Sequence, residues 1–283
     1  MLLPQNWPDW RSLHRKMDKM GKDFLKIIVE KKKEEIAASR RQTPENQLRK
    51  KAESMREEKR LFHDALTRTG KDRINIIAEI KRASPSKGDI RRDLDPYLYA
   101  KLYEKGGATA LSVLTDTTFF KGSFEDFKKA RKGSTLPMLR KDFLISAYQI
   151  FESAVLQADA ILLIARILNR QQLKDYLMLC KDLNLDALVE IHDETDLENA
   201  AWAEAKLIGI NNRNLSSFET DIHTAARLVP RLESYQTPVA ASGIASREDI
   251  LKNRECGISN FLIGESLIRA EDPAALIRSL LES

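Results

Sequence analysis

Residues 74–86 read Ile74-Asn75-Ile76-Ile77-Ala78-Glu79-Ile80-Lys81-Arg82-Ala83-Ser84-Pro85-Ser86, and this stretch predicts the first element of the fold. The apolar run from Ile74 to Ala78 is typical of a buried strand, and it continues into Glu79 and Lys81. Because residues two apart share one face of a strand, these two charged side chains point the same way. Opposite charges on a core strand are costly unless that face opens into a site. The stretch therefore predicts either a buried ion pair or chemistry at the end of a strand.

Seven further apolar runs follow, separated by segments with helical spacing. The eight runs are Ile74–Ile80, Ala110–Leu114, Leu136–Leu139, Ala160–Ile164, Ala187–Ile191, Leu207–Ile210, Pro238–Ala241 and Asn260–Ile263. Runs that are apolar on both faces and alternate with helices indicate parallel strands covered by helices. Eight evenly spaced units predict an α/β protein with a (β/α)8 TIM barrel over residues 74–283. A doubly wound sheet is the alternative, but no GxGxxG follows the first run, which counts against a dinucleotide-binding domain.

Residues 1–73 differ in pattern from the rest of the chain. Their apolar residues recur at helical spacing without a strand pattern, so we expect a helical extension packed on the barrel within a single structural domain. This part holds 20 Lys and Arg against 12 Asp and Glu, whereas residues 74–283 hold 27 against 30. A basic arm that binds nucleic acid is one interpretation. Because Glu30, Glu34 and Glu35 are interspersed among the bases, we favour a solvated helix face and no nucleic-acid partner.

Composition restricts the class of protein further. With 283 residues, 42% of them hydrophobic, the chain can bury a large core. No apolar run approaches the roughly 20 residues that span a bilayer, and the start of the chain lacks a signal-peptide pattern. Two cysteines, Cys180 and Cys256, show no metal-type spacing and indicate a reducing compartment. We therefore expect a cytoplasmic protein with no membrane partner, and a monomer.

Polar residues follow the predicted strands at the end where a TIM barrel carries its active site. Carboxylates, lysines and amides dominate this set, and no metal-ligand spacing appears, so we expect no metal. The set comprises Glu79, Lys81 and Ser84 after the first strand, Thr115 and Asp116 after the second, Arg140, Lys141 and Asp142 after the third, Glu190, His192 and Asp193 after the fifth, and Asn211, Asn212 and Arg213 after the sixth.

The last two predicted strands are followed by small residues. Ser242-Gly243 comes after the seventh strand, and Gly264-Glu265-Ser266 comes after the eighth. Small residues expose backbone N–H groups, and barrels often bind phosphate at this pair of loops with the help of a helix N-terminus. The pair of loops therefore predicts a phosphate-binding site.

Six blocks of sequence together carry a family resemblance. They are Glu79–Ser86, Leu111–Thr115, Arg140–Phe143, Leu188–Asp193, Gly209–Leu215 and Phe261–Leu267. In order and spacing the blocks resemble indole-3-glycerol-phosphate synthase, and the resemblance extends over roughly residues 25–280. It implies a TIM barrel whose helical extension caps the barrel.

The resemblance also implies an activity. A synthase of this family is a carboxy-lyase that closes 1-(2-carboxyphenylamino)-1-deoxyribulose 5-phosphate to indole-3-glycerol phosphate in tryptophan biosynthesis, losing CO2 and water without a cofactor. The lysine matching Lys141 would polarise or protonate the substrate carbonyl, and Glu190 would be the second acid/base group. Lys81 would contact the anionic substrate, and Glu79 would orient the lysines and balance their charge.

Further positions match residues that hold the substrate in this family. Ser84, Asn211 and Arg213 would position the substrate and the polar network, with Asn211 counted among the catalytic residues. Phe120, Phe143 and Leu162 would form apolar walls around the aromatic ring. The implied partner is an anionic sugar phosphate, with other enzymes of the pathway as candidate partners.

One position departs from the family pattern. The family commonly has Glu-Ser-Gly after the seventh strand, whereas this chain has Ala241-Ser242-Gly243. Losing an anion from a site that holds Lys81 and Lys141 raises its net charge and favours the neutral lysines. The outcome could be a slower synthase, a synthase whose network is rearranged around Glu79 and Glu190, or a catalytically impaired barrel that only binds phosphorylated ligands. We favour retained activity, because the other matching positions are intact.

Overall fold

The computed structural model describes residues 24–55, 60–67, 73–85, 87–212 and 223–282. Eight parallel strands close into a barrel in the order β1-β10-β9-β8-β7-β6-β5-β4. These strands are β1 (Asn75–Ile80), β4 (Ala110–Leu114), β5 (Met138–Lys141), β6 (Ala160–Ile164), β7 (Asp186–Ile191), β8 (Leu207–Asn211), β9 (Thr237–Ala241) and β10 (Asn260–Ile263). The (β/α)8 prediction is confirmed, and closure excludes the doubly wound alternative.

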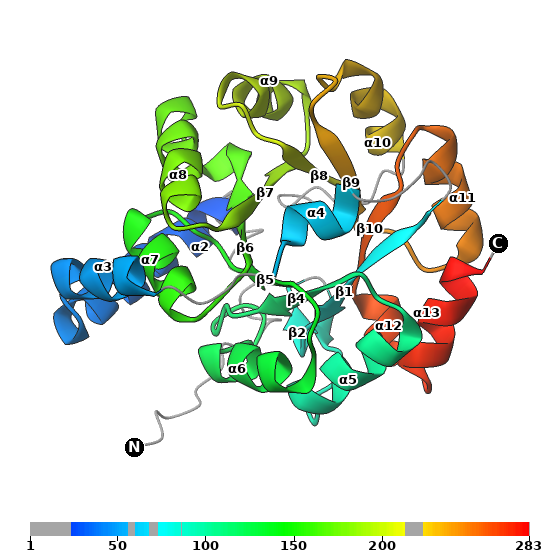
Figure 1. Ribbon diagram of the computed structural model, residues 1–283, viewed down its shortest axis with the longest axis horizontal. Coiled ribbons are helices and arrows are strands. Elements are labelled where there is room, and N and C mark those ends of the chain that lie inside the picture. The colour runs from blue at the N-terminus through cyan, green and yellow to red at the C-terminus, as the bar shows by residue number, and fades with distance from the viewer. Residues whose placement is uncertain (1–23, 56–59, 68–72, 86, 213–222, 283) are drawn as a thin grey trace, which may run out of the picture.

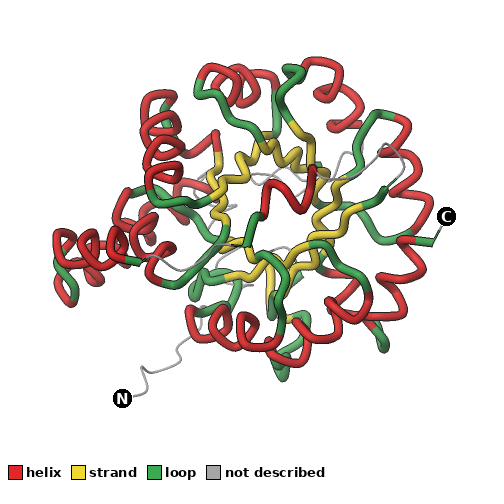
Figure 2. The backbone as a smooth tube through the Cα atoms, viewed as in Figure 1, coloured by secondary structure: helices red, strands yellow, loops and turns green. Residues whose placement is uncertain are grey.

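Helices surround the strand ring (Figures 1 and 2). They are α5 (Pro96–Gly106), α6 (Phe124–Gly133), α7 (Ala147–Val155), α8 (Arg170–Asp182), α9 (Glu194–Trp202), α10 (His223–Leu228), α11 (Arg247–Glu255), α12 (Glu265–Arg269) and α13 (Pro273–Leu281), with short 3-10 turns at Ala165–Ile167 and Val229–Arg231. A small antiparallel hairpin, β2 (Ala83–Ser84) with β3 (Gly88–Asp89), follows β1.

Local sequence explains where these helices begin and end. In α5, the Asp95 side chain accepts a hydrogen bond from Tyr97 N at 3.0 Å, and Pro96 occupies the first turn. Gly107 then ends the helix at a φ of 96°, a backbone conformation that glycine adopts without steric cost. Local capping residues therefore set both ends of α5.

One strand is shifted from its predicted position. The sequence pattern predicts a run over Leu136–Leu139, whereas β5 extends over Met138–Lys141. The prediction ended at the charge of Arg140, but this guanidinium is buried against Thr115, Ser153 and the Gln149 carbonyl. Because these hydrogen bonds satisfy the buried guanidinium, the strand continues past Arg140.

The barrel interior is closed at its N-terminal end by α4 (Phe62–Thr67). Figures 1 and 2 draw this helix across the centre of the strand ring. Phe62 and Leu66 are buried in one cluster with the interior residues Ile77 and Leu188. This arrangement leaves the opposite, C-terminal end of the strands for a site.

The remaining helices of the extension are α2 (Phe24–Gln42) and α3 (Glu45–Ser54). Phe24 and Ile28 of α2 share the apolar cluster that contains Phe143 and Leu162 at the C-terminal ends of the strands. The α3 helix packs beside α7, at the left of Figure 1. Within the described residues, no helix is long and apolar enough to cross a membrane.

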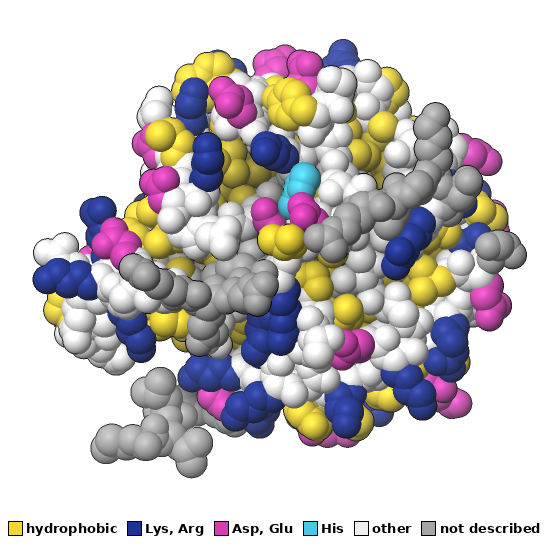
Figure 3. All heavy atoms as spheres, viewed as in Figure 1, with side chains coloured by type: hydrophobic (Ala, Val, Ile, Leu, Met, Phe, Trp, Pro, Cys, Tyr) yellow, Lys and Arg dark blue, Asp and Glu magenta, His cyan; other side chains and the backbone are white. Residues whose placement is uncertain are grey.

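The prediction of a solvated charged face on the extension is wrong at Lys32. The ammonium groups of Lys31 and Lys33 form exposed pairs with Glu34 and Glu30 one turn away, as expected. Lys32 is 3% exposed, because it points toward the barrel instead of solvent. On the face drawn in Figure 3, Lys and Arg side chains are interspersed with Asp and Glu side chains around the rim.

Candidate active site

A cavity of about 420 Å³ opens at the C-terminal ends of the strands. Its lining includes every residue predicted for catalysis or substrate binding that the structure describes; Arg213 lies outside the described residues. These residues are Glu79, Lys81, Ser84, Phe120, Lys141, Phe143, Leu162, Glu190, Asn211, Ser242, Gly243, Gly264 and Glu265. Ala241 also lines the cavity.

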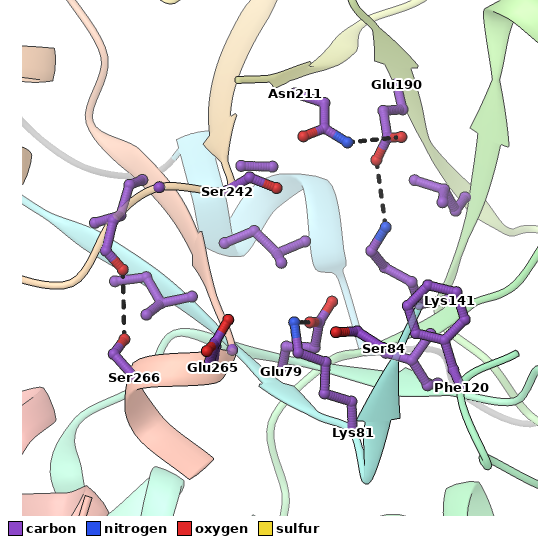
Figure 4. A pocket seen from close by; sticks show the side chains of 18 of the residues that line it. Glu79, Lys81, Ser84, Phe120, Lys141, Glu190, Asn211, Ser242, Glu265 and Ser266 are labelled. Carbon is purple, nitrogen blue, oxygen red and sulfur yellow. Dashed lines mark hydrogen bonds and ion pairs between the residues drawn. The ribbon is translucent and has the colours of Figure 1, made fainter. Parts of the chain in front are cut away.

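The Glu79 and Lys81 side chains form an ion pair on one wall of the cavity (Figure 4). Lys81 Nζ lies 2.7 Å from Glu79 Oε1, and Glu79 is 4% exposed. Gly264 lies against this pair, because a Cβ atom at that position would come within 2.5 Å of Glu79 Oε1. The absence of a side chain at residue 264 therefore makes room for the carboxylate.

A second group of linked polar side chains, from three other strands, extends across the cavity. Lys141 Nζ lies 3.3 Å from Glu190 Oε2, and Asn211 Nδ2 donates to Glu190 Oε1 at 3.1 Å. Burial by itself would lower the pKa of the Lys141 ammonium. The Glu190 and Glu79 carboxylates outweigh burial, so the pKa of Lys141 lies above its ordinary value. Lys141 therefore remains a proton donor over the neutral pH range.

The two pairs contribute two ammonium groups and two carboxylates to the cavity, which Asp142, Glu265 and Arg269 also line. Glu79 and Glu190 lie on different walls and each holds one lysine, so an entering anion meets charges that are already oriented. An ammonium held by a carboxylate can deliver a proton to an oxygen and share its charge with the partner. This arrangement suits proton transfer to a substrate oxygen.

One end of the cavity is apolar. The rings of Phe120 and Phe143 lie 6.0 Å apart between centroids at an angle of 40°, and Leu162 lines the same cavity. Asp116 fixes the loop that carries Phe120, because its Oδ1 accepts from Phe119 N at 2.6 Å and Phe120 N at 2.9 Å. This end is suited to a planar aromatic group.

The other end, with Ser242, Glu265 and Ser266 in Figure 4, is shaped by backbone. Ser242 and Gly243 have φ angles of 68° and 75°, in the left-handed region. A non-glycine residue there is uncommon and is held by its surroundings. Asn212 helps to hold Ser242 in this conformation, because its Nδ2 donates a hydrogen bond to the Ser242 carbonyl at 3.2 Å.

Sequence reasoning missed Arg269 at this end. Arg269 lines the cavity, and its Nε donates to Glu265 Oε1 at 3.0 Å. The i,i+4 spacing of Glu265 and Arg269 on α12 was the available signal. The Glu265 carboxylate is therefore directed to Arg269.

The Ser84 hydroxyl is a polar group without a partner in the site. Ser84 is buried in the cavity wall, and no hydrogen-bond partner of its Oγ lies among the described residues. A buried hydroxyl of this kind is costly unless a ligand or water satisfies it. Across the described part of the chain, no group of three or more His, Cys, Asp or Glu residues is arranged to hold a metal ion.

Comparison with known proteins gives consistent relatives. A family model described as indole-3-glycerol phosphate synthase matches residues 25–280. The indole-3-glycerol phosphate synthase of Desulfosudis oleivorans is 55% identical over 260 residues, covering 92% of this chain and 98% of that protein. The protein of the same name from Syntrophobacter fumaroxidans is 48% identical over 258 residues, covering 91% and 97%.

A solved structure supports the fold alone. Thiamine phosphate pyrophosphorylase from Pyrococcus furiosus superposes with a TM-score of 0.55 at 14% sequence identity. The match covers 74% of this chain and 95% of that one.

Proposed function

The chain belongs to the indole-3-glycerol phosphate synthase family, and from that premise we propose that Lys141, Glu190 and Lys81 carry out its ring closure. The protein is a decarboxylating lyase of tryptophan biosynthesis that acts on a phosphorylated small molecule. The observation that carries the assignment of residues is the pair of lysine–carboxylate contacts, Lys141–Glu190 and Lys81–Glu79, across one cavity.

The reaction needs a proton at the substrate carbonyl oxygen. In 1-(2-carboxyphenylamino)-1-deoxyribulose 5-phosphate, the ring carbon that bears the carboxylate attacks the carbonyl carbon, and a new carbon–carbon bond forms. Lys141 donates a proton to the carbonyl oxygen, which becomes a hydroxyl. The raised pKa of Lys141 supports this role, since it keeps the ammonium protonated before the attack.

Two groups must then leave the cyclised intermediate. CO2 departs with cleavage of the bond to the carboxylate, and the electron pair restores the aromatic ring. The hydroxyl departs as water after gaining a proton, and the neighbouring ring carbon, which was the C1 methylene of the substrate, loses a proton as the indole forms with its N–H retained. Glu190 is the group we assign to these proton transfers, and Asn211 orients its carboxylate through the 3.1 Å hydrogen bond.

Substrate binding follows the polarity of the cavity. The aromatic ring lies at the end formed by Phe120, Phe143 and Leu162, with its carboxylate near Lys81 and the Ser84 hydroxyl. The phosphate lies at Ser242, Gly243 and Gly264, where the first turn of α12 presents backbone N–H groups. Glu265 contributes its backbone N–H, because its carboxylate pairs with Arg269.

Ala241 leaves a gap in the charge pattern that the family resemblance implies. With Ala241, two carboxylates balance the two lysines of these pairs. The pKa of Lys141 nevertheless lies above its ordinary value because of Glu190 and Glu79, which supports a protonated Lys141 without a carboxylate at position 241. Ala241→Glu tests this balance: a faster variant would make the missing carboxylate a deficit, and an unchanged rate would make Glu79 and Glu190 sufficient.

The assay for the assignment follows indole fluorescence after the purified protein is mixed with the carboxyphenylamino-deoxyribulose phosphate. We expect Lys141→Met and Glu190→Gln each to lower kcat by roughly 100-fold or more, because each removes a proton-transfer group. Exposed Lys128→Met serves as the matched control and should leave kcat unchanged. Wild-type kcat in Lys141→Met would overturn the assignment of residues.

We also propose that the chain acts as a monomer in a reducing, cytoplasmic compartment. Cys180 and Cys256 are free thiols, which supports a reducing compartment. The Lys32 contacts with Asp116 and Asp142 support a single structural domain of extension (1–73) and barrel (74–283). We expect one cooperative transition when the protein is unfolded with urea. We expect the elution volume of a monomer in size-exclusion chromatography.

A further inference from the structure

Lys32 of the helical extension is buried among three carboxylates. Its Nζ lies 2.7 Å from Asp116 Oδ2, 2.9 Å from Asp142 Oδ1 and 2.8 Å from Glu35 Oε2. Asp116 and Asp142 follow β4 and β5 at the mouth of the barrel, whereas Lys32 and Glu35 belong to α2. One ammonium group therefore joins the extension to two strand ends of the active site.

The Asp116 contact reaches the aromatic wall. Asp116 Oδ1 accepts from the backbone N–H groups of Phe119 and Phe120, and its Oδ2 faces Lys32. Thr118 of the same loop donates to Glu35 Oε1 at 2.8 Å. The α2 helix thus holds the loop at two points, Asp116 and Thr118, and Thr118 lies two residues before Phe120.

The Asp142 contact reaches the proposed proton donor. Asp142 directly follows Lys141, and its Oδ1 accepts from Phe143 N at 2.8 Å as well as facing Lys32. Its Oδ2 accepts from Thr115 Oγ1 at 2.6 Å and lies 3.2 Å from Arg140 Nη2. Displacement of Asp142 would therefore move the backbone on both sides, at Lys141 and at Phe143.

A stability role alone does not account for this arrangement. Replacing a buried ion pair by apolar groups is often neutral or stabilising, so burial of a lysine needs another reason. Among the described residues, Lys32 is the only cation within ion-pair distance of Asp116. An apolar residue at position 32 could fill the space, but it could not fix the Asp116 and Asp142 carboxylates relative to each other.

We propose that Lys32 is a positioning residue for the ring closure. By bridging Asp116 and Asp142, it fixes the position of Lys141 relative to the apolar wall formed by Phe120 and Phe143. The inference rests on the proposed role of Lys141. It makes the helical extension part of the active-site machinery, since a residue 84 positions before Asp116 fixes the geometry of two strand ends.

The test compares Lys32→Met with two controls on the same helix. Lys31→Met makes the identical substitution at an exposed neighbour, and Ile36→Ala truncates a buried residue of the hydrophobic core. We expect Lys32→Met to lower kcat/KM at least tenfold, with lower kcat and higher KM, because misplacement by about 1 Å can cost about 100-fold. Both controls should keep wild-type kcat and KM at a temperature where circular dichroism finds every variant folded.

The outcomes separate this inference from the proposed function. A folded Lys32→Met with the kcat and KM of Lys31→Met would overturn the positioning role, while a strong loss in Lys141→Met would leave the proposed function standing. No loss in Lys141→Met would instead refute the proposed function itself.

A second variant decides the case in which Lys32→Met does not fold. Asp116→Asn keeps an oxygen for the Phe119 and Phe120 N–H groups but removes the charge that faces Lys32. We expect a KM several-fold higher with a smaller change in kcat, because Asp142 still holds the backbone beside Lys141. An unchanged KM in Asp116→Asn would overturn the inference.

Discussion

Gly264→Ala perturbs the active site by a single methyl group. The new Cβ would lie 2.5 Å from Glu79 Oε1, 3.0 Å from Lys81 Nζ and 3.2 Å from Glu79 Cβ, whereas ordinary contact begins at 3.4 Å. The Glu79 carboxylate must therefore move by about 1 Å, and Lys81 must follow it to keep the ion pair. Since misplacement by about 1 Å can cost about 100-fold, we expect kcat/KM to fall by roughly 10- to 100-fold.

The fold should tolerate the same substitution. The nearest atoms, Glu79 Oε1 and Lys81 Nζ, are the ends of flexible side chains, and Gly264 has a φ of −129°, which any residue adopts. We expect a destabilisation of about 1 kcal/mol, at the low end for overpacking, or a Tm lower by about 2–4 °C. Indole fluorescence would give kcat/KM, and circular dichroism would give Tm.

A matched control and a binding measurement make this prediction sharp. Gly209→Ala also adds a methyl group within the barrel, but its nearest neighbours are Leu188 side-chain atoms at 3.4 Å or more, so kcat/KM should stay close to wild type. Because Gly264 also lies at the proposed phosphate site, the affinity for inorganic phosphate must be measured in parallel. Wild-type kcat/KM in Gly264→Ala, or a loss matched entirely by lost phosphate affinity, would refute the reasoning about Glu79.

Three further predictions concern other parts of the molecule. The Glu79 carboxylate is one of two that raise the pKa of Lys141, so Glu79→Gln should move the alkaline limb of the kcat–pH profile to lower pH; a fixed limb would contradict this. Burial raises the pKa of the Cys180 thiol, whereas Cys256 is partly exposed. Iodoacetamide at pH 8 should therefore give a single adduct, at Cys256, in intact-mass spectra of the folded protein, and two adducts only after unfolding. Phe62 of α4 is fully buried at the closed end of the barrel, so Phe62→Ala should lower the free energy of unfolding by about 3–5 kcal/mol in a urea titration; a loss below about 1 kcal/mol would mean that α4 does not seal the core.

Most of the fold was predictable because its determinants are local. A strand buried on both faces must be apolar along its length, so runs such as Ala110–Leu114 and Ala160–Ile164 give the strand bounds directly. The β5 strand was harder to place, because the charge of Arg140 resembles a strand end in sequence. Only the partners of Arg140, which come from other segments, make its burial acceptable.

The members of the candidate site were predictable, but only one of its two ion pairs was. The rule that barrel sites lie at C-terminal strand ends selected Glu79, Lys141 and Glu190 from the sequence. It could not assign Lys141 to Glu190, because that distance depends on how β5 and β7 are arranged around the ring. The Glu79–Lys81 pair was foreseeable, because residues two apart share one face of a strand. Arg269 was missed because the i,i+4 spacing of Glu265 and Arg269 is equally typical of an exposed helix face and so does not point to the cavity.

The sequence by itself determined that this protein is a (β/α)8 barrel of the indole-3-glycerol phosphate synthase family, because periodicity and motif spacing are properties of the chain. Tertiary structure alone decided that Lys32, one of three successive lysines, leaves the solvated face of its helix. A buried ammonium is stable only where carboxylates converge on it, and Asp116 and Asp142 converge on Lys32 only after the strands have closed into a barrel.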